Sequence, residues 1–324
     1  ISFLITQVLF LILISAVAEW TAIQKTMENK IKIAYVAALG HSGSTILDIM
    51  MGTFPRLIGL GEVSTLLANN NEWLEKKDHF CSCGMPISKC IFWGKVAPCI
   101  KYAKNTKKNY QEKYLIILTE FQKVFGDEAI LVDSSKEKKY LKLISSIAEI
   151  DLKVIHLIRD VRTWTESRKD KIRRKGLVLL NKHWKKNRGQ GIVLPYLYNF
   201  PVFLFWRWYI STMRTKRLIA RRGVESFQVG YEEIALSGDI VIPRLCKFLG
   251  IDYSKQMLDL RKSKSHIAAG NRMRLQGKKQ NKFQYDNRWF YKNDWQLPSI
   301  VFPNIMRFNY REVYRHTKQS LWNS

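Results

Sequence analysis

Apolar runs alternate with amphipathic stretches along this chain of 324 residues, and the two patterns predict different elements. Short continuous runs rich in Ile, Val and Leu predict buried strands, and these lie at residues 31–39, 129–133, 152–160 and 224–231. Between the runs, apolar positions recur at helical spacing. The predicted helices cover residues 44–51, 110–126, 136–148, 161–172 and 238–250.

This alternation predicts an α/β fold in three layers, with a central parallel sheet flanked by helices. The apolar fraction of 46% and the charged fraction of 25% are ordinary globular values, which argues against disorder. No internal repeat or low-complexity linker divides residues 27–324. We therefore expect one domain with insertions there.

The first 18 residues carry no charge. As a helix they would extend about 27 Å at 1.5 Å per residue, just short of the roughly 30 Å of bilayer hydrocarbon. Residues 1–26 are thus either a membrane anchor or a leader that does not belong to the mature protein, with Met27 as the natural start. As an anchor, the segment would be followed by Lys25, Lys30 and Lys32, and the positive-inside rule would keep the main domain cytoplasmic.

The net charge of +27 indicates an anionic partner, but it does not say which one. Residues 168–188 hold ten Lys or Arg together with Trp184, a composition that also suits a nucleic-acid-binding module. Such a module would bind with a steep salt dependence and without a nucleotide requirement. We disfavour that alternative because composition alone is a weaker signal than a motif with defined spacing.

The segment between the first strand and its helix reads as a phosphate-binding loop. Gly40 and Gly43 permit a tight turn and a close approach to a ligand, and the amides of residues 42–45 would face an anion at the helix N-terminus. Ser42, Ser44 and Thr45 add hydroxyls. Measured against G-x-x-x-x-G-K-[ST], however, Ala38 replaces the first glycine and Ser44 replaces the lysine. The loop therefore suits a single phosphate rather than a triphosphate, or is an ordinary tight turn.

A second phosphate ligand set follows the strand at residues 152–160. Arg159 stands at the end of this strand, and Ser167 lies eight residues later, about two turns along the predicted helix. Arginine binds phosphate bidentately, and a serine hydroxyl completes such a pocket. Alone the signal is weak, because arginine after a buried strand is often a surface charge.

Together these segments resemble the sulfotransferases that use 3′-phosphoadenosine 5′-phosphosulfate (PAPS). In that family, a loop ending in S-G-[ST]-T after the first strand binds the 5′-phosphosulfate, and an R-x(7)-S pair after a later strand binds the 3′-phosphate. Here the similar segments are "HSGST" (residues 41–45) and the pair Arg159 and Ser167. The likeness runs in order over about residues 31–295. It includes "GLGEV" at 59–63, "VDSSK" at 132–136, "YEEI" at 231–234, "HIAAGNRMR" at 266–274 and the cysteine-bearing "CSCGMPISKCIFW".

The resemblance implies a P-loop-type fold, PAPS as co-substrate, and transfer of its sulfuryl group to an acceptor hydroxyl or amine. The cofactor-binding residues it implies are Gly40, His41, Ser42, Gly43, Ser44, Thr45, Arg159, Ser167, Asn271 and Arg274. Its tyrosylprotein members carry a catalytic glutamate after a glycine, and Gly61–Glu62 is similar.

Three residues are the catalytic candidates. Glu62 is the candidate base, with a surface or capping role as the alternative, and Lys136 is the candidate cation at the leaving group. His41 stands where cytosolic members carry lysine, so the division of the cationic role between His41 and Lys136 stays open. No metal is expected in the reaction.

Five cysteines are present, of which Cys81, Cys83, Cys90 and Cys99 form C-x-C-x6-C-x8-C with His79 nearby. This pattern matches no common zinc spacing, and an odd total argues against a complete disulfide framework. We expect a loop with reduced thiols or one local disulfide.

Two questions stay open at this level. A nucleotide kinase is the alternative enzyme, but it would need the missing P-loop lysine. The acceptor is not specified, since carbohydrate, lipid, small alcohol and peptide all offer a hydroxyl. Residues 168–188 and the aromatic residues 192–210 form either an acceptor lid or a solvated helix followed by a core helix.

Overall fold

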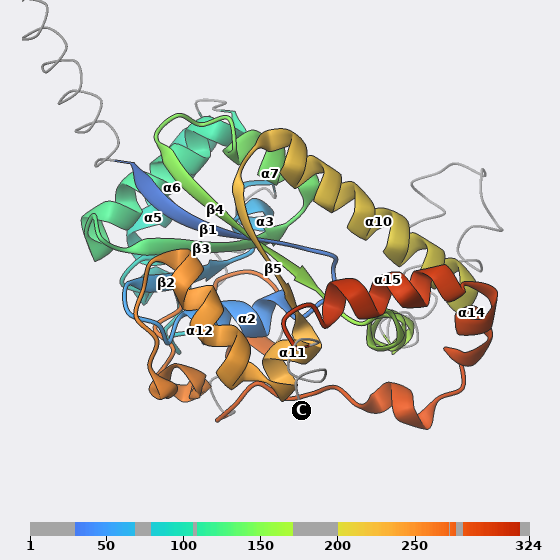
Figure 1. Cartoon of the computed structure of the whole chain (residues 1–324). Helices are drawn as coiled ribbons and strands as arrows, with labels where there is room; N and C mark the ends of the chain where they lie inside the picture. Colours follow the sequence, from blue (N-terminus) through green and yellow to red (C-terminus); the bar gives the residue numbers. More distant parts are fainter. Residues whose placement is uncertain are drawn as a thin grey trace, which may run out of the picture.

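A five-stranded parallel sheet between two layers of helices forms the centre of the protein (Figure 1). The computed structural model describes residues 30–68, 79–105, 109–170, 200–271, 273–276 and 281–317. The predicted three-layer α/β fold class is confirmed.

The strands run in the spatial order β2-β3-β1-β4-β5, and every neighbouring pair is parallel. Their bounds are β1 Ile31–Ala38, β2 Leu57–Gly61, β3 Ile130–Lys136, β4 Ile150–Ile158 and β5 Glu225–Gly230. Because all strands are parallel, their carboxyl ends meet at one edge of the sheet, where ligands bind in open α/β sheets.

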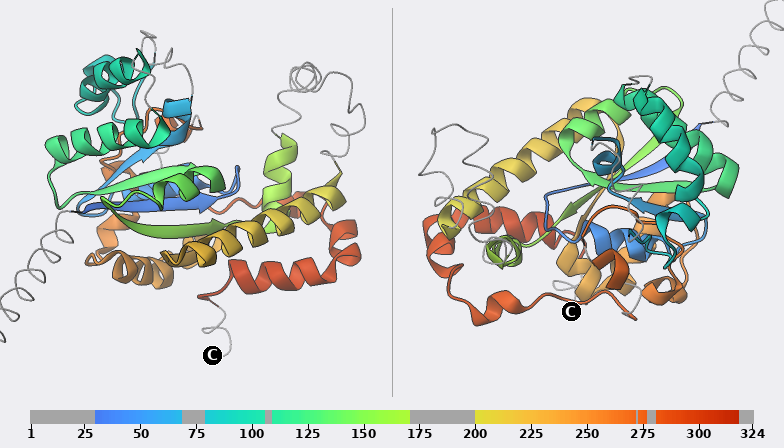
Figure 2. Two further views of the ribbon diagram at one scale, coloured as in Figure 1. Left: turned by 90° about the horizontal axis from the view of Figure 1, so that it is seen from above. Right: turned by 180° about the vertical axis from the view of Figure 1, so that it is seen from behind.

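Helices cover both faces of the sheet (Figure 2). The α-helices are α2 Ser44–Met51, α3 Val63–Ala68, α5 Trp93–Asn105, α6 Tyr110–Phe125, α7 Lys138–Ile144, α10 Pro201–Arg222, α11 Tyr231–Leu236, α12 Gly238–Leu249, α13 Met273–Gln276, α14 Gln296–Val301 and α15 Pro303–Val313. Short 3-10 turns lie at η1 Ile87–Lys89, η2 Lys255–Leu258, η3 Leu260–Lys262 and η5 Arg288–Tyr291. Residues 161–170 are also helical.

Alternation along β1 assigns its side chains to the two layers. Ile33 and Tyr35 point into the core formed with α3, α5, α6 and α7, whereas Ala34 and Val36 point into the core formed with α2 and α12. This is the period of two expected of a strand. A third apolar cluster joins residues 161–164 to α10 and α15 beside the sheet.

Strand β2 was not predicted from the sequence, because "LIGLG" has two glycines, which are depleted in strands. Its backbone explains them. A Cβ on Gly59 would lie 1.8 Å from Oδ1 of Asp48, and Gly61 has a φ of 77°. The helix predicted over residues 136–148 is also shorter, because β3 continues to Lys136 and the helix begins at Lys138.

The described residues include no helix that is long and apolar enough to cross a membrane. The hydrophobic leader at residues 1–18 and most of the basic segment at residues 168–188 lie outside the described residues. The membrane-anchor hypothesis therefore stays a prediction.

Asp48 on α2 holds β2 in place. Its carboxylate accepts a hydrogen bond from the Gly61 amide at 3.1 Å, and the Ser265 hydroxyl donates to its backbone oxygen at 3.1 Å. The carboxyl is fully buried, and burial raises its pKa to about 7. The folded protein thus holds the neutral form of Asp48 at mildly acid pH.

We predict that Asp48 makes the protein less stable as the pH rises. A carboxyl whose pKa is raised by folding contributes most stability below its unfolded pKa and loses it as pH rises through the folded pKa. Between pH 5 and pH 8, the free energy of unfolding of the wild type should fall by roughly 2–3 kcal/mol more than that of Asp48→Asn. Urea unfolding at both pH values measures this difference. Parallel pH dependence of the two proteins would contradict it.

Candidate active site

The loop between β1 and α2 has the backbone of an anion-binding turn. Gly43 adopts a φ of 89° and ends the turn, and a Cβ there would lie 2.4 Å from the Tyr231 ring. No side chain caps α2, and its first turn contains no acid. Since the first amides of a helix have no intrahelical acceptor, this N-terminus can receive an anion.

Three hydroxyl side chains line the same turn. Ser42, Ser44 and Thr45 are buried, and the space around the missing Cβ of Gly40 is open. Ser44 occupies the position at which a P-loop carries its lysine. The turn therefore offers amides and hydroxyls, and its own cationic candidate is His41.

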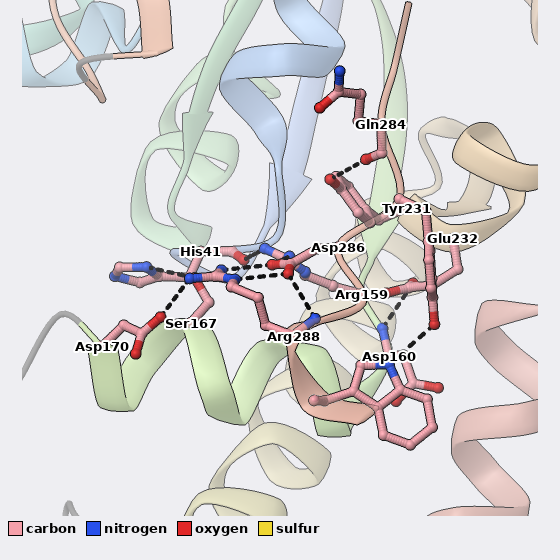
Figure 3. Close-up of polar contacts among 12 residues, drawn as sticks. His41, Arg159, Asp160, Ser167, Asp170, Tyr231, Glu232, Gln284, Asp286 and Arg288 are labelled. Carbon is pink, nitrogen blue, oxygen red and sulfur yellow. Dashed lines mark hydrogen bonds and ion pairs between the residues drawn. The ribbon is translucent and has the colours of Figure 1, made fainter. Parts of the chain in front are cut away.

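Arg159 lies against this loop directly after β4. Its Nη1 donates to the His41 backbone oxygen at 2.8 Å, and its Nη2 donates to Asp286 at 2.5 Å (Figure 3). Its guanidinium lies 4.4 Å from the centre of the Tyr231 ring, a cation–π contact. The side chain is 7% exposed, so this charge is held in a fixed place.

The helix at residues 161–170 brings Ser167 to the loop. Ser167 Oγ lies 3.3 Å from His41 Nδ1, and Trp164 donates its indole N–H to the Gly40 oxygen at 2.9 Å. His41, Arg159 and Ser167 are thus brought together, as the resemblance implies. The phosphate-binding role assigned to them stays a prediction.

Asp286 and Arg288 complete a charge network that the sequence did not indicate. Asp286 accepts from Arg159 and also from Arg288, whose Nε lies 2.7 Å away, and Arg288 in turn pairs with Asp170 (Figure 3). Burial alone would raise the pKa of Asp286, but the hydrogen bond from Arg288 and the two guanidinium charges hold it below its usual value. The Asp286 carboxylate therefore occupies the Nη2 group of Arg159.

The "YEEI" segment holds the backbone next to Arg159 in place. Glu232 accepts the Asp160 amide at 2.9 Å, and its burial, followed by the charge of Asp160, raises its pKa to about 8. Asp160 itself binds Arg162 through two contacts of 2.9 and 2.7 Å. Burial opposes the charge of Asp160, but the Arg162 hydrogen bonds lower its pKa. The charge of Arg162 is therefore paired with that of Asp160, and we assign Arg162 a structural role.

Glu62 and Lys136 form an ion pair at the ends of β2 and β3, with 2.5 Å between Lys136 Nζ and Glu62 Oε1. Their side chains are 23% and 15% exposed, so both remain accessible to a ligand. Lys136 lies in register with Ala37 of β1, a few residues before the loop. The candidate base and the candidate cation thus share the sheet edge with the candidate phosphate loop.

Backbone strain marks two of the candidates. Among described residues other than glycine, φ is positive only at His41 (77°), Arg56 (64°) and Lys136 (69°). Such conformations are unfavourable for residues with a Cβ, and they gather at functional sites. His41 and Lys136 therefore stand out independently of any resemblance.

Buried groups fix the end of β3. Asp133 accepts from Tyr114 Oη at 2.9 Å and from the Ser135 amide at 2.8 Å, and Ser135 Oγ accepts the Ser64 amide at 2.9 Å. Burial raises the pKa of Asp133 to about 6. These bonds join the start of α3, and with it Glu62, to the strand that ends at Lys136.

Asn271 and Arg274 lie on the Glu62 side of the site. Arg274 donates to the Ala268 oxygen at 3.2 Å and contacts His79, whereas Asn271 is exposed and its carbonyl oxygens accept from Met273 and Arg274. Burial lowers the pKa of Arg274. Nucleotide binding by this pair stays a prediction.

The solved structures to which this chain is similar include three sulfotransferases. The sulfotransferase domain of the olefin synthase of Synechococcus PCC 7002 is 17% identical, with a TM-score of 0.48 over 85% of this chain and 95% of that one. A sulfotransferase from Alicyclobacillus acidocaldarius (16%, TM-score 0.37, 71% and 87%) and one from Mycobacterium avium (13%, TM-score 0.43, 90% and 80%) are also similar. No protein-family model and no curated protein matches the chain.

Proposed function

We propose that this protein transfers the sulfuryl group of PAPS to an acceptor hydroxyl or amine and releases adenosine 3′,5′-bisphosphate. The observation that supports this most is the convergence of Arg159 and Ser167, from beyond β4, on His41 of the loop after β1. Two separate anion-binding elements at one sheet edge suit a nucleotide with phosphates on both sides of its ribose.

The loop itself suits the 5′ end of this nucleotide. Its amides and hydroxyls serve one phosphate at the N-terminus of α2. A triphosphate would need a cation where the buried Ser44 stands. The kinase alternative is weaker for this reason.

The 3′-phosphate would bind to Arg159 by replacing Asp286. When no ligand is bound, the Asp286 carboxylate accepts the hydrogen bond of Arg159 Nη2. A phosphate carries more negative charge and offers the same guanidinium more acceptor oxygens. Arg288 remains next to the exchanged position and adds a second cation. Asp286 thus holds Arg159 in its binding orientation until the nucleotide arrives.

In the transfer step, the acceptor oxygen or nitrogen attacks sulfur while the bond from sulfur to the 5′-phosphate oxygen breaks. Glu62 takes the proton of the acceptor. Lys136, released from Glu62, stabilises the charge that develops on the leaving phosphate oxygen, with His41 as a further donor. The resting ion pair keeps both groups in place for this exchange of partners.

The first prediction concerns the ligand. Adenosine 3′,5′-bisphosphate should raise the melting temperature, because a ligand that binds only the folded state stabilises it by mass action. ATP with magnesium at the same concentration should raise it much less. Thermal unfolding with each ligand measures the difference. Equal shifts would contradict the PAPS assignment and favour the kinase.

The second prediction separates the two phosphates. Arg159→Ala should weaken binding of adenosine 3′,5′-bisphosphate by about 1.5–3 kcal/mol, the value of a charge-assisted contact. Binding of adenosine 5′-phosphate, which lacks the 3′ group, should change little. Asp286→Asn is the matched variant and should bind the bisphosphate more tightly, because it removes the competing carboxylate. Calorimetric titration tests all three proteins, and equal weakening for both nucleotides in Arg159→Ala would assign Arg159 to another role.

The third prediction tests the base. Glu62→Gln keeps the volume of the side chain and removes its basicity, so turnover should fall about a hundredfold to ten-thousandfold while nucleotide affinity holds. Glu137→Gln serves as the control, because Glu137 is close in sequence to Lys136 but its side chain is 61% exposed. Initial rates with PAPS and an accepted substrate report the effect. Near-normal turnover in Glu62→Gln would show that Glu62 is not the catalytic base, and His41 would be the next residue to test.

A further inference from the structure

Three cysteines and a histidine from distant parts of the chain meet beside β2. The ligand-capable atoms of Cys81, Cys83, Cys90 and His266 all lie within 4.8 Å of one another. Cys81 and Cys90 are buried, and the other two are partly buried. His266 follows Cys90 by 176 residues, so the group exists only in the folded protein. We propose that these four residues bind a zinc ion.

Three distances among the four atoms match those expected around tetrahedral zinc. With Zn–S bonds of about 2.3 Å, two thiolates on one tetrahedral ion lie about 3.8 Å apart. The Sγ atoms of Cys83 and Cys90 are 3.9 Å apart, and His266 Nδ1 lies 3.3 Å from Cys90 Sγ and 3.9 Å from Cys81 Sγ. Three thiolates and one imidazole are a ligand set of structural zinc sites.

A disulfide explains this arrangement less well. It would use two of three converging thiols and leave the third thiol and the imidazole without a function. In the described chain all five cysteines are free, and Cys99 and Cys246 lie outside the group. The expectation of a reduced loop or one local disulfide rested on the spacing and the odd number of the cysteines, which could not include His266. His79, the histidine near these cysteines in sequence, instead contacts the Ala268 oxygen at 2.6 Å.

The surrounding backbone holds the ligands in place. A tight turn presents Cys81 and Cys83, with the Gly84 amide donating to the Cys81 oxygen at 3.0 Å and the Cys81 amide to the Met85 oxygen at 2.9 Å. His266 is fixed at both sides, because its amide donates to Gly59 of β2 and its oxygen accepts from Trp93 Nε1. Such outer contacts are what metal ligands need to keep their orientation.

The proposed ion joins the cysteine loop to the segment that lies against the candidate base. Ser82 contacts residues 265 and 267 through three hydrogen bonds of 2.7 to 3.1 Å. Two residues later, Ala269 pairs with Gly61 and accepts the Glu62 amide at 3.4 Å. Four protein ligands close the coordination shell, so the ion would be structural and hold this segment beside Glu62.

The test is the metal content of the purified full chain, with Cys99→Ser as the control. The wild type and Cys99→Ser should each contain about one zinc per chain, and Cys90→Ser and His266→Ala should each lose most of it. Cys99 is a matched control because it is a partly buried cysteine on α5 whose thiol contacts only the Lys95 oxygen among described hydrogen bonds.

A second measurement needs no variant. Wild-type protein stripped of metal and titrated with cobalt should show the charge-transfer band of cobalt thiolates and the strong visible bands of tetrahedral cobalt, and zinc should abolish both. Metal removal should also speed amide hydrogen exchange in residues 265–269 but not in β4.

A zinc-free wild type without a cobalt spectrum would overturn the proposal, as would a disulfide between Cys83 and Cys90 found by mass spectrometry. Equal zinc loss in Cys99→Ser would also overturn it. None of these readouts involves a nucleotide, so the zinc site and the proposed sulfuryl transfer can fail independently.

Discussion

The contact between Gly43 and Tyr231 sets the geometry of the whole candidate site. The Tyr231 ring lies so close to Gly43 that even one added carbon would collide with it, and the same ring lies under the Arg159 guanidinium. The loop after β1 and the arginine after β4 are therefore held at a fixed separation by one aromatic ring. Tyr231 is itself anchored by its hydroxyl, which donates to Gln284 two residues before Asp286.

Buried carboxyl groups organise this edge of a strongly basic protein. The chain has 54 Lys and Arg against 27 Asp and Glu, yet Asp48, Asp133, Asp160 and Glu232 are all buried close to it. Each accepts a backbone amide and thereby fixes a loop or strand end. These acids hold the backbone of the site. The cation Arg159 is paired with Asp286 and is nearly buried, whereas Lys136 is paired with Glu62 at a more accessible position.

Local patterns in the sequence were enough to predict four of the five strands, the loop after β1 and the position of Arg159. Strands such as β1 are buried on both faces, so they leave a continuous apolar run, and Gly43 marks the left-handed turn that ends the loop. The edge strand β2 could not be predicted, because glycine has a low strand propensity. Its glycine at position 59 is required by the close approach of Asp48 and Ser265, which the sequence does not show.

Contacts between residues that are distant in sequence could not be predicted either, because local patterns do not show them. Asp286 lies 127 residues from Arg159, and His266 lies 176 residues from Cys90. No local pattern marks Asp286 as the partner of Arg159 or His266 as the partner of Cys90, since both contacts depend on the complete fold. The resemblance supplied roles for residues at the sheet edge, but the partners that hold these residues came from the structure.

The central claim is that one nucleotide bridges the loop after β1 and the residues after β4. A crystal structure with adenosine 3′,5′-bisphosphate tests it most directly. We expect the 5′-phosphate on the amides of residues 43–45, the 3′-phosphate on Arg159 and Ser167, and Asp286 displaced from Arg159. A nucleotide bound elsewhere, or bound with Asp286 still on Arg159 and the 3′-phosphate in solvent, would contradict the account.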